Sequence, residues 1–228
     1  MIELICIDHD VQGDLMFWDQ LARGLASRSI SDVQIGLVLG SAENTERELE
    51  TLGYDVKRVD GALHVSEKAG SVYEISMREE NRRAVTRLTD EGVVAAGFLG
   101  SDRGLLKHID DAWIASKLFK KGLWEADQVV LVVSSVGRSE QGCPVDISPL
   151  NAARIVSSAL SDECQIIHLS QHVTPRMKEA VSAAESTSSN ELKRDNAIPG
   201  WYDFSDLSKK YAVSHVSWIG SQSGLKIH

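Results

Sequence analysis

The chain has 228 residues, of which 43% are hydrophobic and 25% charged, a composition typical of one soluble globular domain or a two-lobed unit. Its net charge of −9 argues against nucleic-acid binding, which needs a clustered basic surface, and weakly against binding to an anionic membrane. No apolar run reaches the length of a membrane span, and the first residues, MIELICIDHD, become acidic before a signal-peptide core could form.

Strands and helices alternate along the first half of the chain. Apolar runs predict strands at 3–11, 33–40 and 93–99, the first of which ends in an acidic tip. Apolar residues at helical spacing predict helices at 14–28, 41–53 and 71–92. A hairpin is expected at 55–67, around Asp60-Gly61.

The second half continues this alternation. A strand at 128–137 precedes a helix at 148–160 with Pro149 in its first turn, where a missing N–H costs nothing. A strand at 165–171, a helix at 174–185, a polar loop at 186–200 that we expect to be mobile, and a strand at 213–220 complete the pattern. The order favours an α/β fold with a mainly parallel sheet.

Three cysteines, Cys6, Cys143 and Cys164, have neither metal-binding nor disulfide-framework spacing. We interpret them as reduced thiols and therefore expect a cytoplasmic protein. His168 and His172 lie four residues apart across a strand end rather than on a helix, so we predict no zinc site there. We favour no metal site elsewhere, although metal binding at Asp8, His9 and Asp10 remains an alternative.

Ligands of parallel α/β sheets bind at the carboxyl ends of the strands. In this sequence those ends are 8–10, 40–42, 100–104, 134–137 and 170–172.

Taken in order, the segments around these ends resemble the amino-acid kinase family, and within it the acetylglutamate kinases most. GFLGSDRGLL at 97–106 falls without a gap on the family pattern GLSGKDGGLI, and LVLGSAENTERELETLG at 37–53 is similar to its strand, glycine-rich loop and helix. RVDGALHVS at 58–66 resembles the substrate hairpin with one extra residue. Three further segments resemble motifs of the family: VVSSVG at 132–137, the NAA segment that ends at Ala153, and VSHVSWIGS at 213–221.

The resemblance implies a three-layer α/β/α sandwich with a mainly parallel central sheet. It implies a single domain over 1–228, with a substrate-side lobe at 1–160 and a shortened nucleotide-side lobe at 161–228. Members of the family transfer the γ-phosphoryl group of Mg-ATP to an acceptor such as a carboxylate, using two lysines that an aspartate orients. Because the family's helix that corresponds to 71–92 commonly packs between subunits, a homodimer or higher homo-oligomer is expected.

The catalytic groups of the family are replaced in this chain. The first lysine falls on Cys6 or Ile7, its glycines give way to Asp8-His9-Asp10 or close neighbours, and the aspartate falls on Leu150. The second lysine falls on Ala180, although Lys107 or Lys178 could stand in for one of the lost lysines. The substrate-binding positions implied by the resemblance are Gly40, Ser41, Ala42, His64, Gly100, Asp146 and Ser148.

Each candidate also has a structural interpretation. Asp8, His9 and Asp10 could bind a metal or form a carboxylate–histidine acid–base pair, or they could be a solvated strand end. The turn from Gly100 to Gly104 could line a pocket, but we favour a tight turn in which Arg103 is solvated. His64 could hold a ligand carboxylate when protonated, or could be a surface histidine. Asp146, where the family has asparagine, adds an anion and favours a ligand with an amine or hydroxyl.

Three functions remain open from the sequence. The first is a kinase-like protein that has lost phosphotransfer and binds a small, amino-acid-like metabolite, or regulates or scaffolds a protein partner. The second is an enzyme with changed chemistry at Asp8-His9-Asp10. The third is a divergent carboxylate kinase that acts on an acylated amino acid, and only this one requires Mg-ATP. We favour the first, because both lysines, the aspartate that orients them and the segments that cover adenine in the family are lost together. Two carboxylates at the strand end would also repel a triphosphate.

Overall fold

The central sheet of the protein has the strand order β12-β11-β1-β2-β8-β5 in the computed structural model, which describes residues 2–27, 33–116, 129–160, 164–170 and 212–218. These strands are β1 (Ile2–Ile7), β2 (Gln34–Leu39), β5 (Ala95–Leu99), β8 (Val130–Ser134), β11 (Cys164–Ser170) and β12 (Ala212–Trp218). Every neighbouring pair is parallel except β11 with β12. The predicted α/β fold with a mainly parallel sheet is therefore confirmed.

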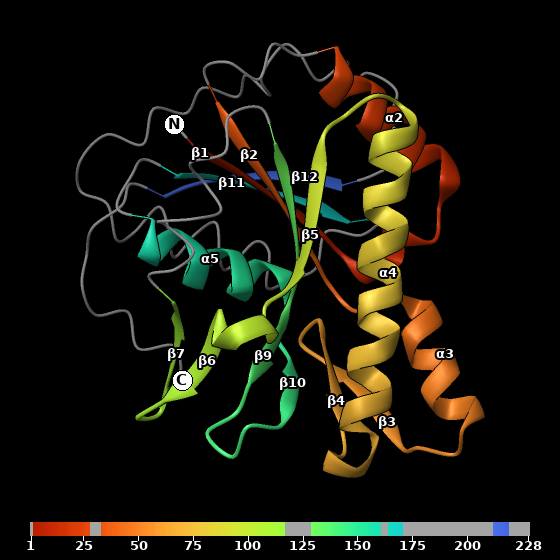
Figure 1. Ribbon diagram of the computed structural model, residues 1–228, viewed down its shortest axis with the longest axis vertical. Coiled ribbons are helices and arrows are strands. Elements are labelled where there is room, and N and C mark those ends of the chain that lie inside the picture. Colours follow the sequence, from red (N-terminus) through yellow and green to blue (C-terminus); the bar gives the residue numbers. More distant parts are fainter. Residues whose placement is uncertain (1, 28–32, 117–128, 161–163, 171–211, 219–228) are drawn as a thin grey trace.

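Helices cover both faces of this sheet (Figure 1). Because successive side chains of a strand point to opposite faces, Ile5 and Ile7 of β1 pack towards α2 (Leu15–Ala26) and α4 (Gly70–Asp90). Leu4 and Cys6 pack on the other face, against α5 (Pro149–Ala159). The described residues thus form the three-layer arrangement that the resemblance implied, with a hydrophobic cluster on each side of the sheet.

Smaller elements gather at the carboxyl edge of the sheet. They are α1 (His9–Gln12), α3 (Glu43–Thr51), the hairpin of β3 (Val56–Val59) and β4 (Ala62–Val65), η1 (Glu67–Ala69) and η2 (Asp102–Gly104). A second sheet has the order β10-β9-β6-β7, with β6 (Leu106–Ile109), β7 (Ala112–Ala115), β9 (Val136–Arg138) and β10 (Pro144–Asp146). These elements lie beyond the strand ends and form the surroundings of the candidate site (Figure 1).

The hairpin turn predicted from the sequence is confirmed, whereas the first strand ends earlier than predicted. The hairpin turn has positive φ at both central residues, 56° at Asp60 and 81° at Gly61, which is the type I′ geometry that Asp-Gly favours. The strand expected at 3–11 instead ends at Ile7, and α1 begins at His9. This short helix forms because the Asp8 carboxylate accepts a hydrogen bond from the backbone N–H of His9 and so caps its first turn.

The predicted helix at 174–185, the predicted loop at 186–200, Lys178 and His172 lie outside the described residues. The division into lobes at residue 160 and the cytoplasmic location stay predictions. Within the described ranges, no helix is both long and apolar enough to cross a membrane.

The three cysteines differ in burial. Cys6 and Cys164 are 0% and 1% exposed and Cys143 is half-buried, and the three are not joined in disulfides. Burial raises the pKa of the Cys6 thiol, and the charge of Asp8 raises it further although Arg154 opposes the shift. We expect iodoacetamide to label Cys143 alone among these thiols in the native protein, and all three after denaturation, as measured by peptide mass spectrometry. Native labelling of Cys6 at the rate of Cys143 would contradict this packing.

Candidate functional site

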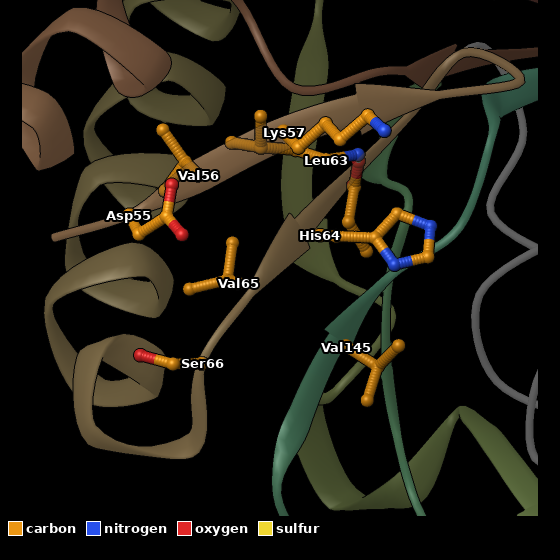
Figure 2. A pocket seen from close by; sticks show the side chains of 9 residues that line it. Asp55, Val56, Lys57, Leu63, His64, Val65, Ser66 and Val145 are labelled. Carbon is orange, nitrogen blue, oxygen red and sulfur yellow. The ribbon is translucent and has the colours of Figure 1, made fainter.

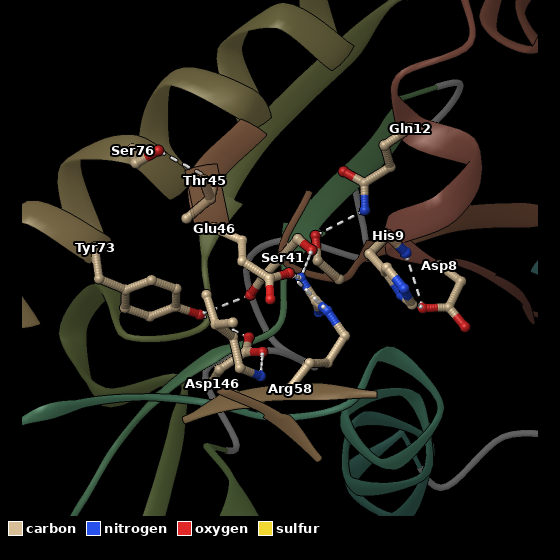
Figure 3. Close-up of polar contacts among 12 residues, drawn as sticks. Asp8, His9, Gln12, Ser41, Thr45, Glu46, Arg58, Tyr73, Ser76 and Asp146 are labelled. Carbon is tan, nitrogen blue, oxygen red and sulfur yellow. Dashed lines mark hydrogen bonds and ion pairs between the residues drawn. The ribbon is translucent and has the colours of Figure 1, made fainter. Parts of the chain in front are cut away.

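Asp8 lies at the carboxyl end of β1, where its carboxylate contacts the imidazole of His9 (Figure 3) and faces that of His168. Its Oδ1 is 2.7 Å from Nδ1 of His9, and its Oδ2 is 3.4 Å from Nε2 of His168 on the adjacent strand β11. Burial by itself would raise the pKa of the Asp8 carboxyl, but the adjacent imidazoles of His168 and His9 outweigh it and lower that pKa below its ordinary value. The carboxylate is therefore held in its ionised form.

The sequence gives no sign of this role for His168, whose spacing to His172 bears only on a zinc site. No spacing rule connects it to Asp8, since 160 residues separate them. The parallel register of β1 and β11, in which Cys6 pairs with His168, brings the two side chains together. Asp10 lies in α1 and is half-buried.

The lowered pKa of Asp8 makes a prediction for acid unfolding. A carboxyl whose pKa is lower in the folded state stabilises that state above its ordinary pKa of 3.8, and this stabilisation is lost as the pH falls through the lowered value. We expect Asp8→Asn, which can still cap α1, to lower the free energy of unfolding at pH 7 by about 2 kcal/mol and by much less near pH 2. Urea titrations of both proteins across this range measure the difference, and parallel pH curves would contradict it.

Gln12 closes the ends of β1 and β2 from above (Figure 3). Its side-chain Nε2 donates to the backbone carbonyl of Gly40 at 2.7 Å and, more weakly, to that of Ile7 at 3.3 Å. The backbone carbonyl of Gln12 accepts a hydrogen bond from Nε1 of Trp18. The segment that resembles a phosphate-binding loop, 40–42, is buried. A methyl group at Gly40 would lie 3.2 Å from the ring of Pro149, so this glycine serves close packing between β2 and α5.

Asp146 belongs to a buried polar network beneath the hairpin (Figure 3). It is 8% exposed, and its oxygens accept hydrogen bonds from the backbone N–H of Leu63 and, at 2.6 Å, from the hydroxyl of Tyr73. The Tyr73 hydroxyl also lies 3.1 Å from Oγ of Ser41, so the network connects β10, α4 and the end of β2. Burial raises the pKa of Asp146 despite these hydrogen bonds, and burial and the nearby carboxylate raise that of Tyr73.

Arg58 of β3 reaches into the same region and was not recognised from the sequence. Its Nε and Nη2 donate to Oε2 of Glu46 at 3.2 and 2.9 Å, and Nη2 also donates to the carbonyl of Ser41. Nη1 is buried and has no hydrogen-bond partner. A half-buried guanidinium group therefore supplies positive charge close to the strand ends, although Glu46 neutralises much of it. The sequence indicates this role of Arg58 only through its position: it lies just before the Asp-Gly turn, on the side of the strand that alternates with the exposed residues.

His64 lines an open groove of about 350 Å³ on the hairpin (Figure 2). His64 and Lys57 face each other across β3 and β4, and Asp55 and Ser66 lie further along the same groove. Its walls are formed by Asp55, Val56, Lys57, Leu63, His64, Val65, Ser66, Val145 and Asp146. The groove therefore combines side chains of both charges, and it brings together two of the predicted positions, His64 and Asp146.

The remaining predicted positions lie at turns. Ser148 precedes α5 and lies beside Gly61 of the hairpin turn, where a methyl group would be 3.5 Å from its Cβ. Gly100 follows β5, and its backbone N–H donates to the carbonyl of Ser134. In the turn that follows, Asp102 accepts from Leu99 N–H and pairs with Arg78, while Arg103 is exposed with φ of 51°. Those contacts agree with the tight-turn interpretation.

Two alternatives left open by the sequence concern a metal ion and a substitute for a catalytic lysine. Within the described ranges, no group of three or more His, Cys, Asp or Glu side chains is placed to bind a metal ion. Lys107, a possible substitute for a catalytic lysine, lies half-buried on β6.

Comparison with known proteins supports the fold only. No family model matches the sequence, and no curated protein matches it significantly. N-acetylglutamate synthase from Neisseria gonorrhoeae, solved with coenzyme A and N-acetyl-glutamate, has a TM-score of 0.59 and 16% identity, over 82% of this chain and 48% of that one. Smu.665 from Streptococcus mutans UA159 has a TM-score of 0.53 and 16% identity, over 71% of this chain and 69% of that one.

Aspartokinase III from E. coli, solved with aspartate and ADP, has a TM-score of 0.53 and 13% identity, over 74% of this chain and 49% of that one. This chain thus spans about half the length of the synthase and of aspartokinase III. Since the identities are far below those that carry function, they establish the fold alone. The protein has the fold of the amino-acid kinases.

Proposed function

We propose that this protein is a kinase-like binding protein that does not transfer phosphate from ATP and that holds a small, polar, amino-acid-like ligand. The observation that supports the loss of phosphotransfer is the state of the β1 end. Asp8 stands there as an ionised carboxylate, capping a helix, where the resemblance called for a glycine-rich turn with a lysine.

Electrostatics make this end of the sheet unfavourable for a triphosphate. A phosphate oxygen about 4 Å from the Asp8 carboxylate would be disfavoured by roughly 4 kcal/mol at an effective dielectric of about 20. The backbone carbonyls of Ile7 and Gly40 at this end are also already occupied, because both accept hydrogen bonds from the side chain of Gln12. Arg58 is committed to Glu46 and the Ser41 carbonyl.

The groove on the hairpin supports an amino-acid-like ligand. Lys57 and His64 can meet a carboxylate, and Asp55 can meet an ammonium group, so one face offers both charges of a zwitterion. Asp146 forms the floor of this groove but is already hydrogen-bonded. Two of the structurally similar proteins were solved with ligands of this class, aspartate and N-acetyl-glutamate.

Calorimetric titration tests both parts of the proposal. We expect heat from at least one member of a panel of free and N-acetylated amino acids, and none from Mg-ATP. The Lys57→Gln/His64→Gln double variant should weaken that binding at least roughly tenfold, whereas Arg103→Gln, an exposed change on the distant turn, should not. ATP-dependent phosphorylation of any carboxylate in the panel would refute the loss of phosphotransfer, and a silent panel would refute the ligand class.

The expected homo-oligomer is a separate prediction. Ile75 is 65% exposed on α4, the helix that the resemblance places between subunits. If α4 packs against a second copy, Ile75→Glu should convert the dimer to a monomer, because a buried charge would face the partner. Light scattering after gel filtration measures the mass, and Glu79→Gln on the same helix is the control for surface charge alone. A monomeric wild-type protein would contradict the prediction.

A further inference from the structure

The contacts of Asp8 and His168 exceed what a helix cap requires. Capping uses one carboxylate oxygen, Oδ1, which accepts from the backbone N–H of His9 at 2.8 Å. The other oxygen faces a histidine that is only 5% exposed, and neither ring nitrogen of His168 has a partner with hydrogen-bond geometry. Burying an imidazole without a hydrogen-bond partner is unfavourable, so such a group in a folded protein requires an explanation.

The three side chains are arranged as an oriented base. His9 presents Nδ1 to Asp8 at 2.7 Å, so an ionised Asp8 favours a proton on that nitrogen. The other nitrogen of His9, Nε2, then carries a free lone pair on a side chain that is 26% exposed. His168, 7% exposed in its side chain, approaches the far oxygen of the same carboxylate and limits its rotation. A base whose orientation is fixed by a carboxylate is the arrangement used in general acid–base catalysis.

We infer that His9 is an acid–base group for proton transfer with a bound ligand, and that Asp8 and His168 are its positioning residues. The step moves one proton: an O–H or N–H of the ligand gives its proton to Nε2 of neutral His9, and the imidazolium formed keeps Nδ1–H on the Asp8 carboxylate. Transfer in the opposite direction restores the neutral ring. The ligand class is a small molecule with a hydroxyl or amine group. This activity extends beyond the binding function proposed above, because a pure binding protein needs no oriented base.

The tautomer of His9 tests the arrangement without any ligand. In ¹⁵N-edited spectra at a pH where the ring is neutral, we expect the proton on Nδ1 of His9 and none on Nε2, assigned with a His9→Gln variant. For His168 the same spectra should show the proton on Nε2, towards Asp8. A proton on Nε2 of His9 with a bare Nδ1 would overturn the inference.

The chemical reactivity of His9 distinguishes an oriented base from a side chain that merely lies beside the helix-capping Asp8. Carbethoxylation by diethylpyrocarbonate, measured by peptide mass spectrometry, reports the lone pair of each imidazole, with His64 and His108 as internal references. Asp8→Asn keeps an acceptor for the cap but removes the charge, and we expect it to slow the modification of His9 by roughly tenfold. His168→Phe should slow it by roughly threefold and His168→Gln, which can still donate to Asp8, by less. Unchanged modification of His9 in Asp8→Asn would show a structural cap only and would overturn the inference.

Discussion

Replacing Asp146 by alanine is expected to lower the free energy of unfolding by about 3 kcal/mol, because two buried donors lose their acceptor. The donors are the backbone N–H of Leu63 and the hydroxyl of Tyr73, and neither can reach water without moving the hairpin or α4. Urea unfolding at neutral pH measures the change. A loss below about 1 kcal/mol would show that the network does not hold these elements together.

Asp146→Asn is the matched control. Its amide oxygen can accept from Leu63 N–H, its NH₂ group can donate to the Tyr73 oxygen, and the Tyr73 hydrogen can turn to Ser41. We therefore expect a loss of only about 1 kcal/mol in the free energy of unfolding.

The contribution of Asp146 to stability depends on pH with the opposite sign to that of Asp8. A carboxyl with a raised folded pKa favours the folded state most below its ordinary value of 3.8, and this contribution is lost as the pH rises through the raised value. Asp146→Asn should therefore remove this pH dependence of the free energy of unfolding.

The sequence predicted the sheet and its covering helices because their periodicity is a local property. Apolar runs such as VLVVS in β8 must be buried on both faces, and helical spacing identified α2 and α4. The hairpin followed from Asp60-Gly61, whose positive φ values few other pairs adopt. What failed locally was the end of β1, where the capping ability of Asp8 outweighed the continuation of the strand.

The site could be predicted only in part, because its contacts join residues distant in sequence. The resemblance selected positions at strand ends, and the structure brings Ser41 and Asp146 together through Tyr73. It gave no indication of Arg58 or His168, since an arginine or histidine on a strand carries no sign of the neighbour it will meet. Which strand lies beside which is a property of the whole sheet, and the pairing of β1 with β11 decides the surroundings of Asp8.

Gly100 is the position where a binding role and a packing role make opposite predictions. A methyl group there would lie 2.5 Å from the carbonyl oxygen of Val136 and 2.5 Å from Cδ1 of Leu106. The oxygen belongs to the backbone of β9 and cannot rotate away, so β5 and the second sheet would have to separate. We expect Gly100→Ala to lower the free energy of unfolding by about 3 kcal/mol, the upper range for overpacking.

Gly104→Ala provides the comparison within the same turn. Gly104 has φ of 65°, but the nearest atom to its added methyl group is Cδ of the flexible Lys107 side chain at 3.7 Å. Only the backbone conformation is strained, which amounts to about 1–2 kcal/mol. If the glycines served a ligand, both substitutions would impair binding while leaving stability nearly equal. Because packing governs Gly100, we expect its stability loss to exceed that of Gly104→Ala, and amino-acid binding measured below the unfolding transition to survive in both variants. Equal stability with lost binding in Gly100→Ala would return this turn to the ligand site.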